Sequence, residues 1–292
     1  MKIILFSRRQ LPHTAGEICQ LFEAFRIFGF DYAVNEEFAP LAEELTGIRI
    51  PPEKIYGQCT GKQPANSVMV CYGGDGTLLE GVHRLCGAPI PVMGINAGHL
   101  GFLTSAPSAG LNLIFKEIAE GRLTTEARSM IEVTGDYAEQ PDTTLALNEF
   151  TVQRHGAGMI SVETYVDDQM VATYHGDGVI FSTPTGSTAY SLSAGGPVVA
   201  PTCRCLVISP LAPHNLTMRP VVIPDSGVIS LRVNARRSDA FVTLDDRTYR
   251  ISHGAAFTVR RAEQQIFLAV PHNISFYDTL RNKMMWGIDI RS

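Results

Sequence analysis

The stretch 72–77, with the sequence YGGDGT, combines glycines that could bind phosphate with a carboxylate that could act on a proton. It follows the apolar run 68–71 and precedes the segment LLEGV at 78–82, which is the order of a strand, a tight turn and a helix. Glycines let the backbone approach a ligand closely, and amides at the start of a helix bind phosphate oxygens. The residues of this turn that we expect to bind phosphate are Gly73, Gly74, Gly76 and Thr77.

Asp75 is the unusual member of this turn. A carboxylate among amides that face phosphate would repel the phosphates. We therefore expect Asp75 to serve a hydroxyl group, either as a general base or as an orienting acceptor. The alternative, in which the turn merely connects a strand to a helix, leaves other polar segments of the chain unexplained.

Three further segments are richer in small and polar residues than packing requires. The segment 96–102 is a second glycine-rich turn after an apolar run, and LNEF occupies 147–150. The longest segment, 176–197, supplies five hydroxyl side chains between residues 182 and 188, followed by Tyr190 and Ser193 at a helical spacing. Such a surface could fix sugar hydroxyls and bases by neutral hydrogen bonds.

The elements that must position these segments change in type along the chain. Apolar runs at 3–7, 68–72 and 90–95 predict buried parallel strands. Further predicted elements are helices at 14–28, 38–45, 77–84 and 111–120, a short strand at 32–34 and a loop at 51–64. This alternation predicts a doubly wound, Rossmann-like α/β domain at 1–125, where ligands bind beyond the carboxyl ends of the strands.

After about residue 125 the pattern consists of short β-rich segments separated by turn signals such as those at 167–168 and 226–227. It predicts a sandwich-like β domain at 126–270. The segment 275–286 is typical of a helix, and we expect the tail 271–292 to pack back on the first domain.

The bulk properties exclude several classes of protein. The chain of 292 residues is 45% hydrophobic and 18% charged, as is ordinary for a globular protein, and its net charge of −5 gives no case for a nucleic-acid partner. Six cysteines without a CxxC pair make a zinc site improbable. The apolar run at residues 3–6 is too short for a signal peptide, and no apolar run approaches membrane-spanning length, so we expect a soluble cytoplasmic protein without a membrane partner.

Three motifs, in this order and spacing, closely resemble the NAD kinase family: 73–77, the pair Asn148-Glu149, and TPTGSTAY at 183–190. The segments 210–220 and 276–286 extend the resemblance over most of the chain from about residue 68. The glycine motif alone also occurs in diacylglycerol kinases, sphingosine kinases and 6-phosphofructokinases. The segment 183–190 is therefore the specific part of the resemblance.

The resemblance implies a phosphotransferase that moves the terminal phosphate of ATP to the adenosine 2′-hydroxyl of NAD, with a divalent metal ion, expected to be Mg²⁺. It also implies a homodimer or homotetramer with shared sites. Asp75 matches the general base or hydroxyl-orienting group, and the glycine turn matches the phosphate side. The residues that match NAD contacts are Leu79 and Phe102 at the adenine, Asn148 and Glu149 at the ribose hydroxyls, and His175, Asp177, Thr188, Ala189, Tyr190 and Ser193 in the later segment.

Two positions depart from the family pattern. Many relatives carry arginine or lysine where this chain has His175, so a positive charge there depends on pH. Asp245-Asp246 stands where relatives often have Asp-Gly in a late turn, which puts the ligand contacts of that turn in doubt. A lipid kinase and a non-catalytic dinucleotide sensor remain as alternatives, and the choices between NAD and NADH and between ATP and polyphosphate stay open.

Overall fold

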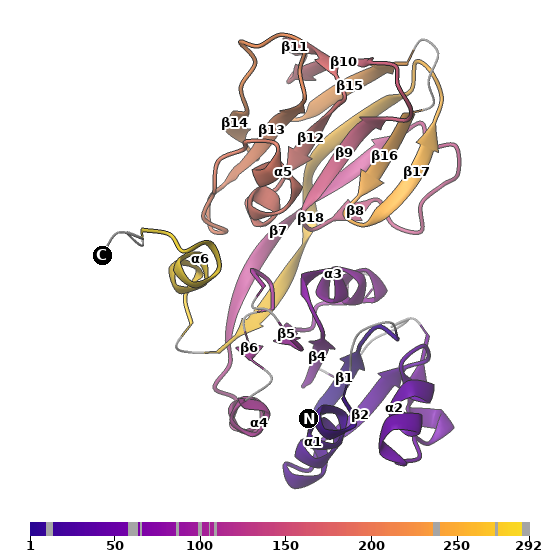
Figure 1. Cartoon of the computed structure of the whole chain (residues 1–292), viewed down its shortest axis with the longest axis vertical. Coiled ribbons are helices and arrows are strands. Elements are labelled where there is room, and N and C mark those ends of the chain that lie inside the picture. The colour runs from indigo at the N-terminus through magenta and orange to yellow at the C-terminus, as the bar shows by residue number, and fades with distance from the viewer. Residues whose placement is uncertain are drawn as a thin grey trace. The chain divides into compact units, whose positions relative to one another are not determined.

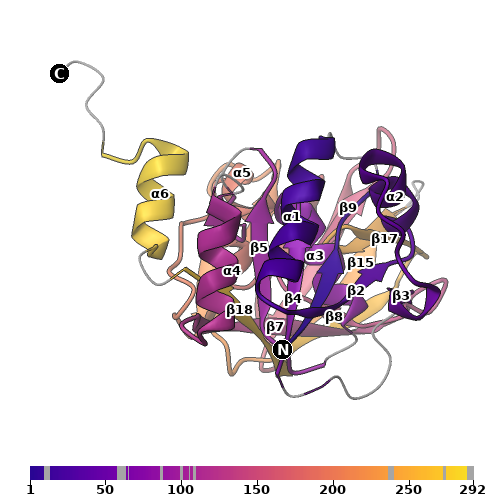
Figure 2. The same cartoon turned by 90° about the horizontal axis from the view of Figure 1, so that it is seen from below.

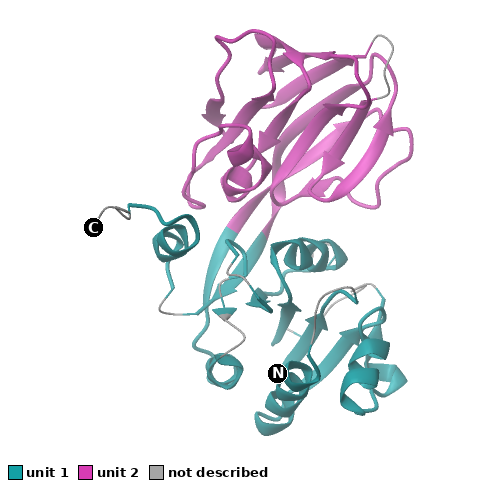
Figure 3. Cartoon of the chain, in the orientation of Figure 1, with its two compact units in different colours: residues 1–127, 266–292 teal, residues 128–265 magenta. Residues whose placement is uncertain are grey.

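The computed structural model describes residues 1–9, 14–57, 64, 66–85, 88–98, 101–104, 106, 107, 110–235, 240–271 and 274–287. Within the predicted turn 96–102, residues 99 and 100 lie outside the described part. The chain forms two compact units, one made of residues 1–127 with 266–292 and the other of residues 128–265 (Figure 3).

The first unit contains a sheet with the strand order β5-β4-β1-β2-β3 (Figure 1). All of these neighbours pair in parallel, and β6 adds to β5 in the same sense. The predicted α/β class is confirmed. The elements of this part are β1 (Lys2–Phe6), α1 (Ala15–Ile27), β2 (Asp31–Asn35), α2 (Ala39–Thr46), η1 (Pro52–Lys54), β3 (Ile55–Tyr56), β4 (Ser67–Tyr72), α3 (Asp75–Arg84), β5 (Val92–Asn96), β6 (Ala106–Pro107), α4 (Leu111–Ala119) and α6 (Phe276–Met284).

Helices cover both faces of this sheet because side chains alternate along its strands. On one face, Ile3 and Leu5 of β1 pack in a core with Phe25 of α1, and α1 lies beside α4 (Figure 2). On the other face α3 packs against β4, where a Cβ built on Gly81 would stand 2.5 Å from the sulfur of Cys71. Glycine at this position therefore permits the close approach of α3 that places the turn before it.

Two predicted boundaries in this unit are wrong. Helix α3 begins at Asp75 instead of Thr77, because Gly74 takes the extended N-cap conformation and its carbonyl accepts the N–H of Thr77 (2.9 Å). The predicted loop 51–64 contains η1 and the short strand β3, which pairs with β2. Asp75 is thus a helical residue, and its side chain projects from the first turn of α3.

The second unit consists of two antiparallel sheets, with the strand orders β14-β13-β12-β9-β16-β17 and β11-β10-β15-β18. Apolar side chains from both sheets, such as Phe150 and Val162, share one core. The predicted β-rich class is confirmed. Its elements are β7 (Thr124–Gly135), β8 (Leu145–Ala146), β9 (Glu149–Arg154), β10 (Ile160–Val166), β11 (Gln169–Gly176), β12 (Gly178–Ser182), η3 (Thr185–Thr188), α5 (Tyr190–Ser193), β13 (Cys205–Leu211), β14 (Val221–Pro224), β15 (Ile229–Asn234), β16 (Ala240–Leu244), β17 (Arg247–Ile251) and β18 (Ala256–Val270).

The strands β7 and β18 each run from one unit into the other, and Leu268 near the end of β18 pairs in parallel with Val92 of β5. Within the described residues, no helix has the length and apolar character needed to cross a membrane.

Candidate active site

The carboxylate of Asp75 is held by the segment 102–104. Its Oδ1 accepts hydrogen bonds from the backbone N–H of Leu103 (3.1 Å) and Thr104 (2.9 Å) and from the Thr104 hydroxyl (2.9 Å). Its Oδ2 accepts one hydrogen bond from the backbone N–H of Phe102 (2.8 Å). The side chain remains 29% exposed, so the carboxylate is fixed in orientation and still open to a ligand.

Two glycines allow this arrangement. Gly73 has a φ of +154° and donates its N–H to the carbonyl of Ile95 (2.9 Å), which ties the turn to β5. A Cβ built on Gly101 would lie 1.8 Å from Oδ1 of Asp75 and 2.4 Å from the Thr104 hydroxyl. Any larger residue at position 101 would therefore displace the carboxylate or the segment that holds it.

A lysine lies beside Asp75, and its ammonium group rests over an aromatic ring. The ammonium of Lys283, on α6, is 3.7 Å from Oδ2 of Asp75 and 4.9 Å from the centre of the Phe102 ring. The Phe102 ring lies 6.4 Å from the ring of Phe276 at the start of α6. Of the other predicted residues, Thr77 is buried and Leu79 is half-buried on α3.

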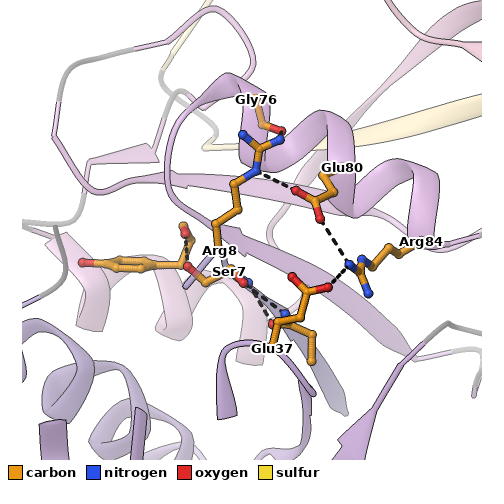
Figure 4. Close-up of polar contacts among 8 residues, drawn as sticks. Ser7, Arg8, Glu37, Gly76, Glu80 and Arg84 are labelled. Atoms are coloured by element: carbon orange, nitrogen blue, oxygen red, sulfur yellow. Dashed lines mark hydrogen bonds and ion pairs between the residues drawn. The ribbon is translucent and has the colours of Figure 1, made fainter. Parts of the chain in front are cut away.

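Charged side chains connect the glycine turn to the rest of the first unit (Figure 4). Arg8, which follows β1, donates to the carbonyl of Gly76 (2.9 Å) and pairs through Nε with Glu80 (2.6 Å). Glu80 also pairs with Arg84 (3.2 Å), and Arg84 pairs with Glu37. The turn is thus held from the side of β1 as well as from β5.

In the second unit, Asp245 holds the backbone around the pair Asn148-Glu149. The carboxylate of Asp245 accepts the N–H groups of Leu147 (2.8 Å), Asn148 (2.7 Å) and Glu149 (3.1 Å). Asp245 lies in the turn between β16 and β17 with a φ of +53°, in the left-handed region that non-glycine residues seldom occupy. The carboxylate of this turn therefore binds backbone amides.

The side chains of Asn148 and Glu149 are buried, and Oδ1 of Asn148 and Oε2 of Glu149 have no hydrogen-bond partner. Burial and the neighbouring charge of Asp245 raise the pKa of Glu149 to about 8, while a hydrogen bond from the Tyr190 backbone acts in the opposite direction. At neutral pH the carboxyl group is thus largely protonated and can both donate and accept. Unpaired buried polar atoms are costly, so they are candidates for ligand hydroxyls.

The segment 183–190 is brought against this pair. The N–H of Thr183 donates to the carbonyl of Asn148 (2.9 Å), and a Cβ built on Gly186 would lie 2.1 Å from the same oxygen. The hydroxyl of Tyr190 accepts from the amide of Gln153 (3.0 Å), and the side chain is 39% exposed. Of the predicted contacts, Thr188 and Ala189 lie half-buried between Gly186 and Tyr190.

Three other predicted residues form no hydrogen bond or ion pair with Asn148 or Glu149 among the described residues. Asp177 pairs with Arg154 at the far end of β9 (2.6 Å), about 16 Å along the strand from Glu149 by the rise of an extended chain. His175 is exposed, and its carbonyl accepts the N–H of His214 (2.9 Å). Ser193 is exposed at the end of α5.

Comparison with known proteins decides the family. Family models described as the ATP-NAD kinase N-terminal and C-terminal domains match residues 55–123 and 147–271. An NAD kinase of Flavobacterium psychrophilum is 34% identical over the full length of both chains, and one of Bacteroides fragilis is 33% identical over the same extent. One of Porphyromonas gingivalis is 40% identical over 76% of this chain and 77% of its own. This chain belongs to the NAD kinase family.

Solved structures of this family share the fold. A yeast NADH kinase complexed with NADH superposes with a TM-score of 0.85 at 21% identity, covering 100% of this chain and 89% of that one. An NAD kinase from Archaeoglobus fulgidus in complex with ATP gives a TM-score of 0.72 at 24% identity, covering 98% of each chain. The predicted fold and the predicted NAD kinase membership are confirmed, and these relatives do not favour the lipid kinase or the sensor.

Sequence reasoning missed three residues that the structure places at the candidate site. Each reaches its partner across a long separation in the chain, so no local pattern marks it. These residues are Arg8, Thr104 and Lys283. The sequence marks Asp245 only as a departure from the family pattern and does not predict that its carboxylate binds the backbone amides of residues 147–149, although an acidic pair in a tight turn is available to bind neighbouring amides.

Proposed function

We infer that this chain transfers the terminal phosphate of ATP to the adenosine 2′-hydroxyl of NAD and so forms NADP. The observation that carries this proposal is the carboxylate of Asp75, which is fixed by three backbone amides and one hydroxyl, with a single donor at Oδ2, while the side chain stays 29% exposed. A carboxylate held in this way is suited to orient a hydroxyl and accept its proton. Membership of the NAD kinase family supplies the reaction in which such a hydroxyl is phosphorylated.

Asn148 and Glu149 are proposed to bind the ribose hydroxyls of NAD. Their unpaired atoms are buried at the start of β9, where Asp245 and the segment 183–190 fix the backbone. A hydroxyl donates one hydrogen bond and accepts others. An unpaired amide oxygen and a protonated carboxyl group match those requirements.

The phosphates of ATP are proposed to bind at the glycine turn, where α3 begins. Backbone N–H groups at a helix start bind anions without repelling them. Among the described residues, no group of three His, Cys, Asp or Glu side chains could hold a metal ion. A Mg²⁺ ion carried mainly by nucleotide phosphates and water needs only one or two protein carboxylates, and such an ion would neutralise phosphate charge when bound.

The remaining assignments stay predictions that rest on the family resemblance. They comprise the roles of Leu79, Phe102, His175, Asp177, Thr188, Ala189, Tyr190 and Ser193, the cytoplasmic location, and the homodimer or homotetramer. Size measurement in solution and single alanine substitutions with NAD titration would test them.

The test of the function is NADP formation by the purified protein with ATP, Mg²⁺ and NAD, compared with NADH as acceptor and polyphosphate as donor. Asp75→Asn should keep NAD binding and lower kcat by about 10²–10⁴-fold, because the amide cannot accept the proton. Asp168→Asn, in an exposed hairpin turn, is the matched control and should keep full activity. Full activity of Asp75→Asn would contradict the proposed role of Asp75 as the base. Phosphorylation of vesicle lipid, with no phosphorylation of NAD, would contradict the proposed acceptor.

A further inference from the structure

Lys283 is held beside Asp75 by the packing of α6. This helix begins with a capping box in which the Ser275 side chain accepts the N–H of Asp278, and the Asp278 side chain accepts the N–H of Ser275. Leu280 is buried, and Phe276 packs near the Phe102 ring. The lysine side chain is 37% exposed and its ammonium lies 3.7 Å from Oδ2 of Asp75.

The two oxygens of Asp75 differ in how they are occupied. Oδ1 has three donors, from Leu103 and Thr104, and Oδ2 has one, from Phe102. An acceptor hydroxyl would therefore bind at Oδ2, at an O···O distance of about 2.7 Å. Oδ2 is also the oxygen that faces Lys283, so a phosphoryl group arriving at this hydroxyl comes within reach of the ammonium.

We propose that Lys283 is a further catalytic residue, whose ammonium binds the phosphoryl group while it moves to the hydroxyl oriented by Asp75. This inference rests on the proposed function. In the step, the acceptor oxygen forms a bond to the γ-phosphorus of ATP, and the bond from that phosphorus to the β,γ-bridging oxygen breaks to release ADP. Oδ2 of Asp75 takes the hydroxyl proton. Lys283 transfers nothing and neutralises charge on the phosphoryl oxygens, as cations do in other phosphoryl transfers.

The geometry argues against a purely structural ion pair. Direct hydrogen bonds between an ammonium and a carboxylate are about 2.7–2.9 Å long, and the separation here is 3.7 Å. A loose, partly exposed ion pair contributes little to stability. The ammonium rests over the Phe102 ring, which holds it by a cation–π contact without taking up its hydrogen bonds.

The proposal makes a prediction about product binding. The phosphoryl group that Lys283 contacts during transfer remains at the same oxygen as the 2′-phosphate of NADP. The wild-type chain should therefore bind NADP more tightly than NAD, and Lys283→Met should lose that preference through weaker NADP binding alone. If Lys283 only supported the fold, its substitution would weaken the binding of NAD and NADP together.

The experiment measures steady-state kinetics and calorimetric binding of NAD and NADP for wild type, Lys283→Met, Lys283→Arg and the control Lys116→Met, an exposed position on α4. We expect Lys283→Met to lower kcat about 10²–10³-fold. Its affinity for NAD should stay within about twofold of the wild-type value, and its affinity for NADP should fall about tenfold. Lys283→Arg keeps the charge and should retain part of both properties, and it serves in place of Lys283→Met if thermal melting shows that the methionine variant is unfolded.

Two outcomes separate this inference from the proposed function. Wild-type NADP formation together with unchanged kcat and unchanged NADP affinity in Lys283→Met would overturn the role of Lys283 alone. Absence of NADP formation by the wild type would overturn the proposed function, and the binding measurements would still decide whether Lys283 contacts the 2′-phosphate.

Discussion

Asp75 in the first unit and Asp245 in the second are held in nearly the same way, but the roles proposed for them differ. Each carboxylate accepts three consecutive backbone N–H groups, from residues 102–104 and 147–149 respectively. Asp75 projects from the first turn of a helix, whereas Asp245 lies at φ +53° in a hairpin turn, and both residues are half-buried. In the proposed function, the same amide cradle presents one carboxylate to a ligand and, at Asp245, fixes the backbone around the proposed ribose site.

Asp245 also influences the pKa of Glu149. Because Asp245 is occupied by the backbone, the ligand at this site is left to other side chains, among them Asn148 and Glu149, whose unpaired oxygens are buried. Asp245 then contributes to their chemistry through its charge, which together with burial raises the pKa of Glu149. In the first unit the neighbouring charge has the opposite sign, since Lys283 faces Asp75.

The largest effect expected among tests of this comparison is that of Gly101→Ala. The new Cβ would lie 1.8 Å from Oδ1 of Asp75, so the cradle must open and the carboxylate must turn. We expect kcat for NADP formation to fall at least about 100-fold, since small displacements of a reacting group cost that much. Gly98→Ala is the control, because no described atom lies within 4 Å of its Cβ. Equal activity of the two variants would show that the cradle does not position Asp75.

Asp245→Asn should have the next largest effect, mainly on stability. The Oδ2 atom accepts the N–H of Leu147, and an amide group there would place one donor against another. We expect the free energy of unfolding in urea to fall by about 1–3 kcal/mol and KM for NAD to rise. Asp168→Asn, at φ +62° in the turn between β10 and β11, is the matched control. Loss of stability without any change in KM for NAD would separate Asp245 from the ligand site.

The third test concerns the pH dependence of stability, where the expected change is the smallest of the three for each step of one pH unit. Because the pKa of Glu149 is raised to about 8 in the folded chain from an ordinary value of 4.5, the folded state binds more protons than the unfolded state between these values. The unfolding free energy therefore falls as pH rises from 4.5 to 8, by at most about 1.4 kcal/mol per pH unit from this residue. Glu149→Gln should make the unfolding free energy depend less steeply on pH between these two values.

Urea unfolding at pH 5, 6, 7 and 8 measures how the unfolding free energy of the wild type and of Glu149→Gln changes with pH. The exposed substitution Glu263→Gln should leave the wild-type curve unchanged. If Glu149→Gln also leaves it unchanged, Glu149 is ionised in the folded protein, and its proposed donor role is lost.

The sequence predicts the architecture well because alternating strands and helices, and later short β segments, leave few arrangements open. It also singles out Asp75, Asn148 and Glu149, because polar residues at strand ends and in glycine turns need no packing role. It does not find Lys283 or Arg8, since each reaches its partner through the folded backbone from a distant part of the chain. The sequence places the start of α3 two residues late because three glycines before Thr77 favour a turn locally. In the structure, Gly81 lets the helix pack closely against Cys71 of the sheet.

The division of the first unit along the chain has a consequence for synthesis. Its sheet and Asp75 lie in residues 1–127, but α6 and Lys283 come from the portion 266–292, after all of the second unit has been made. Segments emerging from a ribosome begin to fold in order. A nascent chain would therefore assemble the glycine turn and its carboxylate long before the neighbouring lysine becomes available, and the cation would be the last part of the site to join it.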